Sequence, residues 1–181
     1  REVGVCNDWA YLNWEVIDWV GIPYTTYTPI PATSSMVTSI ETFDFQMATG
    51  IWRKNLYLTK GQNINNCVPF ISLKCSSSNG YLYQMTPIID LLEDTRVFVR
   101  RYGSTGNIDA RLNVVEFNPA KVKIQKGAVY MTGTTVNATV SSVNTAKTFL
   151  IFYASNETSY TLNYQLMIRG YFTTSTNIEF Y

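Results

Sequence analysis

The chain has 181 residues, of which 46% are hydrophobic, 14% aromatic and 15% charged, and its net charge is +1. It contains no histidine, which excludes a Ser-His-Asp triad, a Cys-His pair and a His-ligated zinc site as these are usually built. The hydrophobic content is sufficient for a packed core, and the length fits one domain. A pI near 7.8 without a basic block argues against nucleic acid as a partner.

The N-terminal segment differs in composition from the rest of the chain. Tryptophans recur at five-residue intervals, and three prolines then fall within residues 23–31, a pattern that excludes a regular helix and a central strand there. We expect residues 1–35 to form a Trp- and Pro-rich arm or linker before a domain of residues 36–181. Its aromatic side chains are candidate anchors on a neighbouring subunit, and the alternative is that the tryptophans cover this chain's own core. The candidate arm residues are Trp9, Trp14, Trp19, Tyr24 and Tyr27.

From residue 36 onward, short runs rich in Val, Ile, Thr, Tyr and Phe are separated by Gly, Asn, Ser and Pro, which predicts strands and turns. Apolar residues alternate with polar ones from Ile108 to Val114, and Val115 and Phe117 then continue in the opposite phase, which suggests a bulge. The expected strands are 36–45, 51–59, 67–74, 81–90, 95–102, 108–117, 121–126, 128–132, 136–142, 148–154, 161–172 and 176–181. This pattern predicts an all-β fold, an antiparallel β-sandwich or a jelly-roll-like arrangement.

Carboxylates are the natural acid–base candidates in a chain without histidine. Asp90, Glu93 and Asp94 cluster in sequence, but their setting is typical of a solvated turn rather than of a glycosidase cleft. Asp44 and Glu116 lie within strand-like runs, where we expect arginine partners. We therefore predict no catalytic residues and no enzymatic activity.

Three cysteines, Cys6, Cys67 and Cys75, give an odd count without a CxxC spacing, so we expect free thiols, no metal site and no cofactor. No apolar run reaches the roughly 18–20 residues of a membrane helix, and we expect no membrane partner.

Arginines gather on two predicted strands that follow one another in the chain. Arg96 and Arg100 share one face with Phe98 between them, an arrangement that can stack a base or a sugar. The alternative is an outward sheet face that forms ion pairs with Asp109 or Glu116, or that joins subunits. The candidate interface or ligand residues are Arg96, Phe98, Arg100, Arg101 and Arg111.

Residues 109–119, Asp-Ala-Arg-Leu-Asn-Val-Val-Glu-Phe-Asn-Pro, precede Val-Lys-Ile-Gln-Lys-Gly at 122–127. This succession resembles a pattern of tailed-bacteriophage structural proteins, in which a Val-Val-Glu-Phe strand comes before a short apolar-Gln-x-Gly hairpin. The Thr-rich strand at 132–140, the Lys-Thr-Phe at 147–149 and residues 61–70 are similar to further parts of that pattern. The resemblance extends over residues 50–181 and implies a virion surface protein of fibre or capsid-decoration type.

The expected function is accordingly that of a non-enzymatic structural protein of a virion, located on the particle surface and attached through its N-terminal arm and sheet surfaces. We expect other virion proteins as partners and a homo-oligomer, with a trimer favoured, because symmetric assembly covers exposed sheet edges. The alternative is a carbohydrate-binding adhesin module that contacts host surface glycans, since the thirteen tyrosines and many amides suit adaptable contacts.

Overall fold

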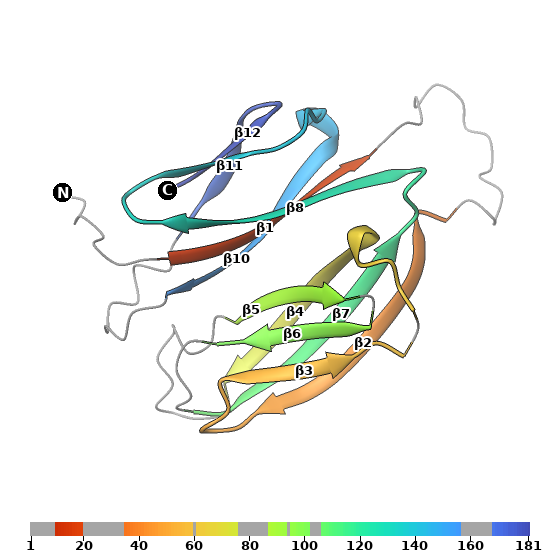
Figure 1. The fold of residues 1–181 in the computed structure, drawn as a ribbon, viewed down its shortest axis with the longest axis vertical. Coiled ribbons are helices and arrows are strands. Elements are labelled where there is room, and N and C mark those ends of the chain that lie inside the picture. The colour runs from red at the N-terminus through yellow and green to blue at the C-terminus, as the bar shows by residue number, and fades with distance from the viewer. Residues whose placement is uncertain are drawn as a thin grey trace.

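The computed structural model describes residues 10–19, 35–59, 61–75, 87–93, 95–101, 106–156 and 168–181 (Figure 1). These ranges consist mostly of antiparallel strands, and the all-β prediction is confirmed. Within them no helix has the length and apolar character needed to cross a membrane. The strands are β1 Ala10–Trp19, β2 Val37–Met47, β3 Arg53–Tyr57, β4 Cys67–Cys75, β5 Ile88–Glu93, β6 Arg96–Arg100, β7 Ile108–Phe117, β8 Val122–Met131, β9 Val136–Thr139, β10 Thr148–Asn156, β11 Gly170–Thr174 and β12 Asn177–Phe180. Two short 3-10 turns, η2 Ile64–Asn66 and η4 Thr145–Lys147, precede β4 and β10.

The described strands form four antiparallel sheets of three strands each. Sheet A has the order β10-β1-β8, sheet B β2-β7-β4, sheet C β3-β6-β5 and sheet D β11-β12-β9. In Figure 1 sheets A and D form the upper half of the view, and sheets B and C form the lower half. The finer description as a β-sandwich or jelly roll stays a prediction.

Buried apolar side chains unite these sheets in three clusters. The first cluster packs sheet B against sheet C and includes Val97, Val99 and Leu112. The second packs sheet A against sheet D and includes Leu12 and Phe180. The third joins the two halves and consists of Ile17, Val68, Phe117 and Val122, with partly buried neighbours. Sheet A is thus covered by apolar contacts on both of its faces.

Residues 10–19 form the middle strand of sheet A, where β1 pairs with β10 on one side and β8 on the other. Leu12, Trp14 and Val16 point into the cluster shared with sheet D, and Ile17 points toward sheet B. This part of the expected arm therefore belongs to the folded body. The apolar–polar alternation from Leu12 to Val16 shifts phase at Ile17. This shift and the prolines that follow hid the strand from the sequence pattern.

The expected arm residues divide accordingly. Trp14 is 6% exposed and lies in this chain's own core, which is the alternative stated for the tryptophans. Trp19 is the last residue of β1, and its side chain lies outside the described set. Trp9, Tyr24 and Tyr27 also lie outside the described residues.

The bulge expected at Val114–Val115 is wrong. The register of β7 runs without interruption through both residues against β2 and β4, and the shift lies instead in β2, between Val37 and Ser39. The phase changes because the two faces of β7 meet different clusters: Val114 packs between sheets B and C, whereas Phe117 packs toward sheet A.

The runs 121–126 and 128–132 were expected as two strands and form the single strand β8. Gly127 does not break this strand, because it lies directly across from Trp14 and leaves room for the indole ring. Residues 81–86 and 161–167, which were expected to be in strands, lie outside the described ranges.

Candidate functional site

The five residues expected to form one interface or ligand face do not lie together. Arg96, Phe98 and Arg100 lie on β6 in the middle of sheet C, and Arg111 lies on β7 in the middle of sheet B. Val97 and Leu112 from these two strands meet in the core between the sheets. Because side chains alternate along a strand, Arg96 and Arg100 point away from this core on one side of the molecule, and Arg111 points away on the other.

Arg101 is a structural residue. It is 3% exposed, and its guanidinium donates to the carbonyl oxygens of Ile51 at 2.9 Å, Gly106 at 2.9 Å and Ala48 at 2.9 Å. A longer contact of 3.4 Å reaches the carbonyl of Met47. The planar fork of arginine suits several acceptors at once, so Arg101 holds the β2–β3 connection against the end of β6.

Arg111 forms a two-pronged ion pair with Asp44, with Nε to Oδ1 at 2.7 Å and Nη2 to Oδ2 at 2.9 Å. The expectation of an arginine partner for Asp44 is thereby confirmed. The hydrogen bond from Arg111, more than its charge, holds the pKa of Asp44 below its usual value. This pair borders an open depression of 570 Å³ on the outer face of sheet B, where Lys74 and Asp109 also lie. The two positive and two negative side chains balance, so this depression carries no net charge.

Glu116 does not bond an arginine in the contacts that the structure describes. One carboxylate oxygen accepts from the Ser39 hydroxyl at 3.0 Å, and the other accepts from the backbone N–H of Asn63 at 3.1 Å. Glu116 therefore fastens the segment before η2 to the end of sheet B.

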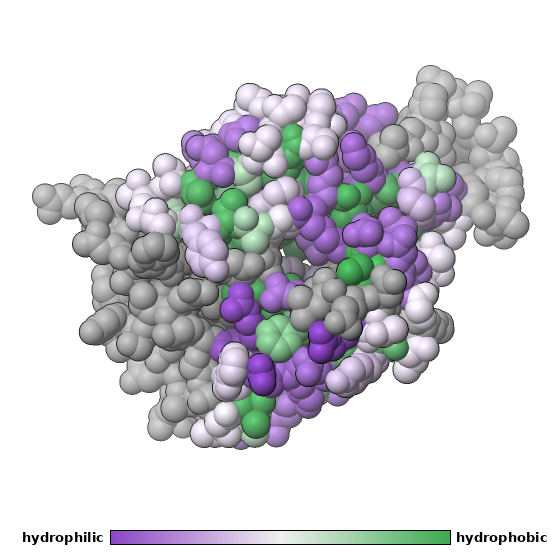
Figure 2. Space-filling model, in the orientation of Figure 1, coloured by the Kyte–Doolittle hydropathy of each residue, from purple (hydrophilic) through white to green (hydrophobic). Residues whose placement is uncertain are grey.

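The outer face of sheet C combines arginines with aromatic rings. Across the sheet, Arg53 lies opposite Arg100, Asn55 opposite Phe98, and Tyr57 opposite Arg96. In Figure 1 the strands of sheet C lie in front of those of sheet B, and Figure 2 shows strongly hydrophilic and hydrophobic residues side by side over this region. We use the name "sheet C face" for the described residues Trp52, Arg53, Asn55, Tyr57, Asp90, Arg96, Phe98 and Arg100.

Two aromatic rings project from this face. Trp52 is 50% exposed and Tyr57 is 64% exposed. The Arg53 guanidinium carbon lies 4.9 Å from the centre of the Trp52 ring, a favourable cation–π distance. These residues were missed from sequence, although Arg53, Asn55 and Tyr57 alternate within the expected strand 51–59. Their relation to Arg96 and Phe98 depends on which strand pairs with β6.

The acidic cluster contributes one described side chain to this face. Glu93 lies in strand β5 rather than in the expected turn, and Asp90, which ends the expected strand 81–90, lies in the same strand. The Asp90 carboxylate is 3.5 Å from Arg100 Nε. The side chain of Glu93 and all of Asp94 lie outside the described residues. Asp90 therefore acts here as an ion-pair partner of Arg100.

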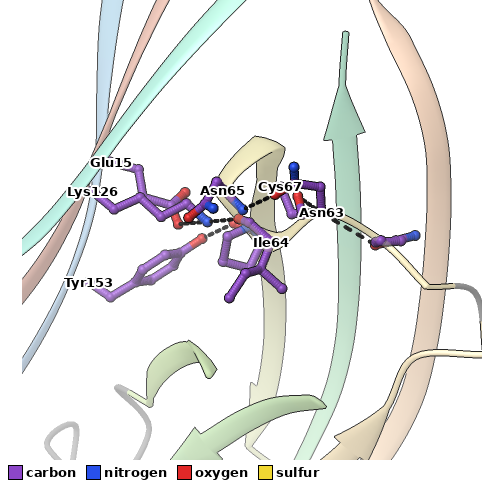
Figure 3. Close-up of polar contacts among 9 residues, drawn as sticks. Glu15, Asn63, Ile64, Asn65, Cys67, Lys126 and Tyr153 are labelled. Carbon is purple, nitrogen blue, oxygen red and sulfur yellow. Dashed lines mark hydrogen bonds and ion pairs between the residues drawn. The ribbon is translucent and has the colours of Figure 1, made fainter. Parts of the chain in front are cut away.

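A second polar group lies buried where sheet A meets η2 (Figure 3). Glu15 and Lys126 are direct cross-strand partners on β1 and β8, with Lys126 Nζ 3.8 Å from Glu15 Oε1. Lys126 Nζ also donates to the carbonyl of Ile64 at 2.5 Å. Glu15 Oε2 accepts no hydrogen bond within the described part of the chain. We call Glu15, Lys126 and Tyr153 the seam residues.

The burial of the seam residues shifts their pKa values. Loss of solvent raises the pKa of Glu15 from 4.5 to about 8, although Lys126 opposes this rise. The same loss of solvent lowers the pKa of Lys126 against the opposing effect of Glu15. Burial also raises the pKa of Tyr153, whose hydroxyl donates to the carbonyl of Pro69. Both members of the Glu15–Lys126 pair are thus shifted toward their neutral forms.

Cys67 lies on the other side of η2. It is a fully buried thiol that forms no disulfide, as expected for this cysteine, and its sulfur donates to the carbonyl of Asn63 at 3.3 Å. Cys6 and the side chain of Cys75 lie outside the described residues. Among the residues that the structure describes, no group of three or more His, Cys, Asp or Glu residues is placed to hold a metal ion.

Comparison of the chain with protein-family models, with curated proteins and with solved structures finds no match. The resemblance to bacteriophage structural proteins therefore rests on the sequence pattern alone.

Proposed function

We propose that this chain is a non-enzymatic structural protein of a virion surface, of fibre or capsid-decoration type, and that it assembles as a homo-oligomer, with a trimer favoured. The observation that carries this proposal is the exposure of ten large hydrophobic side chains in the described ranges, each at least 38% exposed. The chain also has an unusually low charged fraction of 15%, compared with about 25% in typical soluble domains. Such a surface is prone to association, and assembly covers it.

The polar clusters support a structural role as well. Arg101 bonds backbone carbonyls, Glu116 bonds a hydroxyl and a backbone N–H, and the seam residues tie sheet A to η2 and β4. Each of these groups therefore links separate strands or turns of the fold to one another. Because β1 belongs to the core, the surfaces available for assembly are the sheet faces rather than residues 10–19.

The location of the chain on a particle tests this proposal. An antibody raised against the full chain is applied to virions purified from infected cells that produce it, and the particles are imaged by electron microscopy. Regular labelling at symmetry-related surface positions is the expected result. A protein found in infected cells but missing from intact particles would contradict the proposal.

A second candidate function, a carbohydrate-binding adhesin module, is favoured by the exposed rings of Trp52 and Tyr57 on the sheet C face. Aromatic rings stack on sugars, and the amide of Asn55 and the nearby guanidinium groups can bind hydroxyls. A glycan array probed with the full chain tests this function. Binding that is lost in Trp52→Ala and Tyr57→Ala supports it, and an array without any bound glycan contradicts it.

A further inference from the structure

We infer that the outer face of sheet D binds a neutral saccharide through a pair of adjacent sugar hydroxyls. The inference rests on the second candidate function, the carbohydrate-binding module, but it places the site on a face other than the sheet C face. Sheet D lies on the opposite side of sheet A from sheet B, and in Figure 1 its strands β11 and β12 lie at the upper end of the molecule. We use the name "sheet D face" for Asn137, Arg169, Tyr171, Asn177, Glu179 and Tyr181.

Alternation along the strands separates this face from the core. Ile178 and Phe180 of β12 are fully buried in the cluster shared with sheet A, so Glu179 between them points outward. Across the sheet, Glu179 lies between Tyr171 on β11 and Asn137 on β9. One row over three strands therefore carries an aromatic ring, a carboxylate and an amide. The row is about 10 Å long, since neighbouring strands lie about 4.8 Å apart, and a disaccharide can span it.

The Tyr171 ring is held in place by two neighbours of the same face. Its hydroxyl donates to Glu179 Oε1 at 2.6 Å. The ring also packs edge-to-face against Tyr181, with the ring centres 5.5 Å apart and the ring planes at 86°. Tyr171 and Tyr181 are each 45% exposed. A fixed and half-exposed ring suits stacking on a sugar, because little conformational entropy is lost on binding.

Two polar groups of the same row keep unused hydrogen-bonding capacity. Glu179 Oε1 accepts from Tyr171, whereas Oε2 accepts from no group in the described part of the chain. Asn137 Oδ1 accepts from Asn177 Nδ2 at 2.8 Å, whereas its own amide nitrogen donates to no group within the same ranges. Asn177 Nδ2 also donates to Thr173 Oγ1 at 2.7 Å, which fixes the amides. A free acceptor and a free donor on neighbouring strands match two adjacent sugar hydroxyls, one donating to Glu179 and the other accepting from Asn137.

The charge of the sheet D face favours a neutral ligand. Arg169 and Tyr181 exchange both backbone hydrogen bonds, so Arg169 extends this face at one end of the sheet and balances Glu179. A face with one cation and one anion offers no repeated positive charge to a nucleic acid or an acidic polysaccharide. Its remaining side chains are amides and tyrosines rather than the aliphatic residues that help to form the core of a protein interface.

Isothermal titration calorimetry with the full chain tests the inference. Three of the probes, cellohexaose, maltohexaose and mannohexaose, are neutral and carry adjacent free hydroxyls. In the fourth, chitohexaose, an acetamido group replaces one hydroxyl of each pair, and the fifth, a hyaluronan hexasaccharide, is anionic. We expect at least one of the first three to bind, and we expect chitohexaose and hyaluronan to bind at least tenfold more weakly.

Substitutions of nearly unchanged shape test the two polar contacts. Glu179→Gln keeps an oxygen for the Tyr171 hydroxyl but turns the free acceptor into a donor. Asn137→Asp keeps an acceptor for Asn177 but removes the free donor. Each should weaken binding about tenfold, the equivalent of one lost hydrogen bond. Tyr171→Ala should abolish measurable binding, whereas Tyr130→Ala, which removes a 52% exposed ring from β8, is the matched control and should bind as the unmodified chain does.

The outcomes separate the inference from the adhesin function. Binding that persists in Tyr171→Ala and is lost in Trp52→Ala would overturn the inference and leave the adhesin function standing. Equal binding of chitohexaose, or tighter binding of hyaluronan, would overturn the inference as well. No binding of any of the five probes would overturn it too, and the adhesin function would fall with it only if the glycan array is also empty. If Tyr171→Ala turned an oligomer into single chains, the sheet D face would be a subunit contact, and the inference would be wrong.

Discussion

Trp14 lies directly across from Gly127 in sheet A, and its indole ring covers the position where any other residue would carry a Cβ atom. A Cβ at Gly127 would lie 2.7 Å from Trp14 Cε2, closer than real Cβ contacts allow. Gly170 and Phe180 repeat this relation in sheet D, where the added Cβ would lie 2.8 Å from the ring. Glycine in these strands is therefore required by the aromatic residue across from it.

Gly127→Ala should destabilise the protein by about 1–3 kcal/mol, because the buried ring of Trp14 has to move within a packed core. Urea denaturation followed by tryptophan fluorescence measures the change. Gly133→Ala is the matched control, since a Cβ there would meet nothing within 4 Å. An equal effect of the two substitutions would show that Trp14 does not occupy the space above Gly127.

Arg101→Met should lower the free energy of unfolding by roughly 3 kcal/mol or more, because buried carbonyls would lose their charged donor. The urea midpoint reports this loss. Arg111→Met removes the same charge from an exposed ion pair with Asp44 and should move the midpoint much less, since exposed pairs contribute little. A larger effect at Arg111 than at Arg101 would be inconsistent with the role assigned to Arg101.

The raised pKa of Glu15 predicts a pH dependence of stability. Between pH 4.5 and pH 8 the unfolded chain releases a proton that the folded chain keeps, so the free energy of unfolding should fall as pH rises through this range. The pKa of Lys126 is lowered by burial. This residue therefore makes the free energy of unfolding rise with pH at alkaline pH, below its usual pKa of 10.5.

Glu15→Gln keeps the shape of the side chain and stays neutral. Urea denaturation at several pH values should show a flatter curve for this variant, which matches the unmodified protein near pH 4.5 and exceeds its stability near pH 8. Parallel curves for the two proteins over this range would contradict the assignment of the slope to Glu15.

Removal of residues 1–19 should abolish the native fold. The deletion takes away four buried apolar side chains of the described residues, Leu12, Trp14, Val16 and Ile17. At about 1.5–3 kcal/mol each, their loss is comparable with a total stability of about 5–15 kcal/mol. It also leaves β8 and β10 with unpaired edges. Near-ultraviolet circular dichroism of the truncated chain should show no fixed aromatic packing, whereas a soluble, cooperatively unfolding product would mean that β1 is an arm after all.

Much of the strand pattern was predictable because most strands have one face toward a core. The alternation from Ile108 to Val114 located β7, and turn residues located its neighbours. Strand β1 was not predicted because its apolar residues occupy both faces and because prolines follow it in the sequence. The continuity of strand β8 was not predicted, because glycine usually marks the end of a strand. The reason for a glycine at position 127 is visible only from its pairing with Trp14.

The candidate site was predictable in part. The arrangement of Arg96, Phe98 and Arg100 on one face follows from alternation along a single strand, and the structure places β6 accordingly. Arg111 lies on a different sheet from these residues, since strands that follow one another in the sequence need not share a sheet. The contribution of Trp52 and Tyr57 depends on the pairing of β3 with β6, and cross-strand neighbours are set by long-range pairing that no local pattern encodes.

The oligomeric state of the full chain tests the central claim most directly. Light scattering coupled to size-exclusion chromatography gives the mass in solution, and the chain itself has a mass of 20.6 kDa. The proposed assembly predicts a multiple of this mass, with three copies favoured, that persists on dilution. A mass of one chain at every concentration would contradict the proposal that this protein forms a homo-oligomer in which the subunits cover one another's exposed hydrophobic side chains.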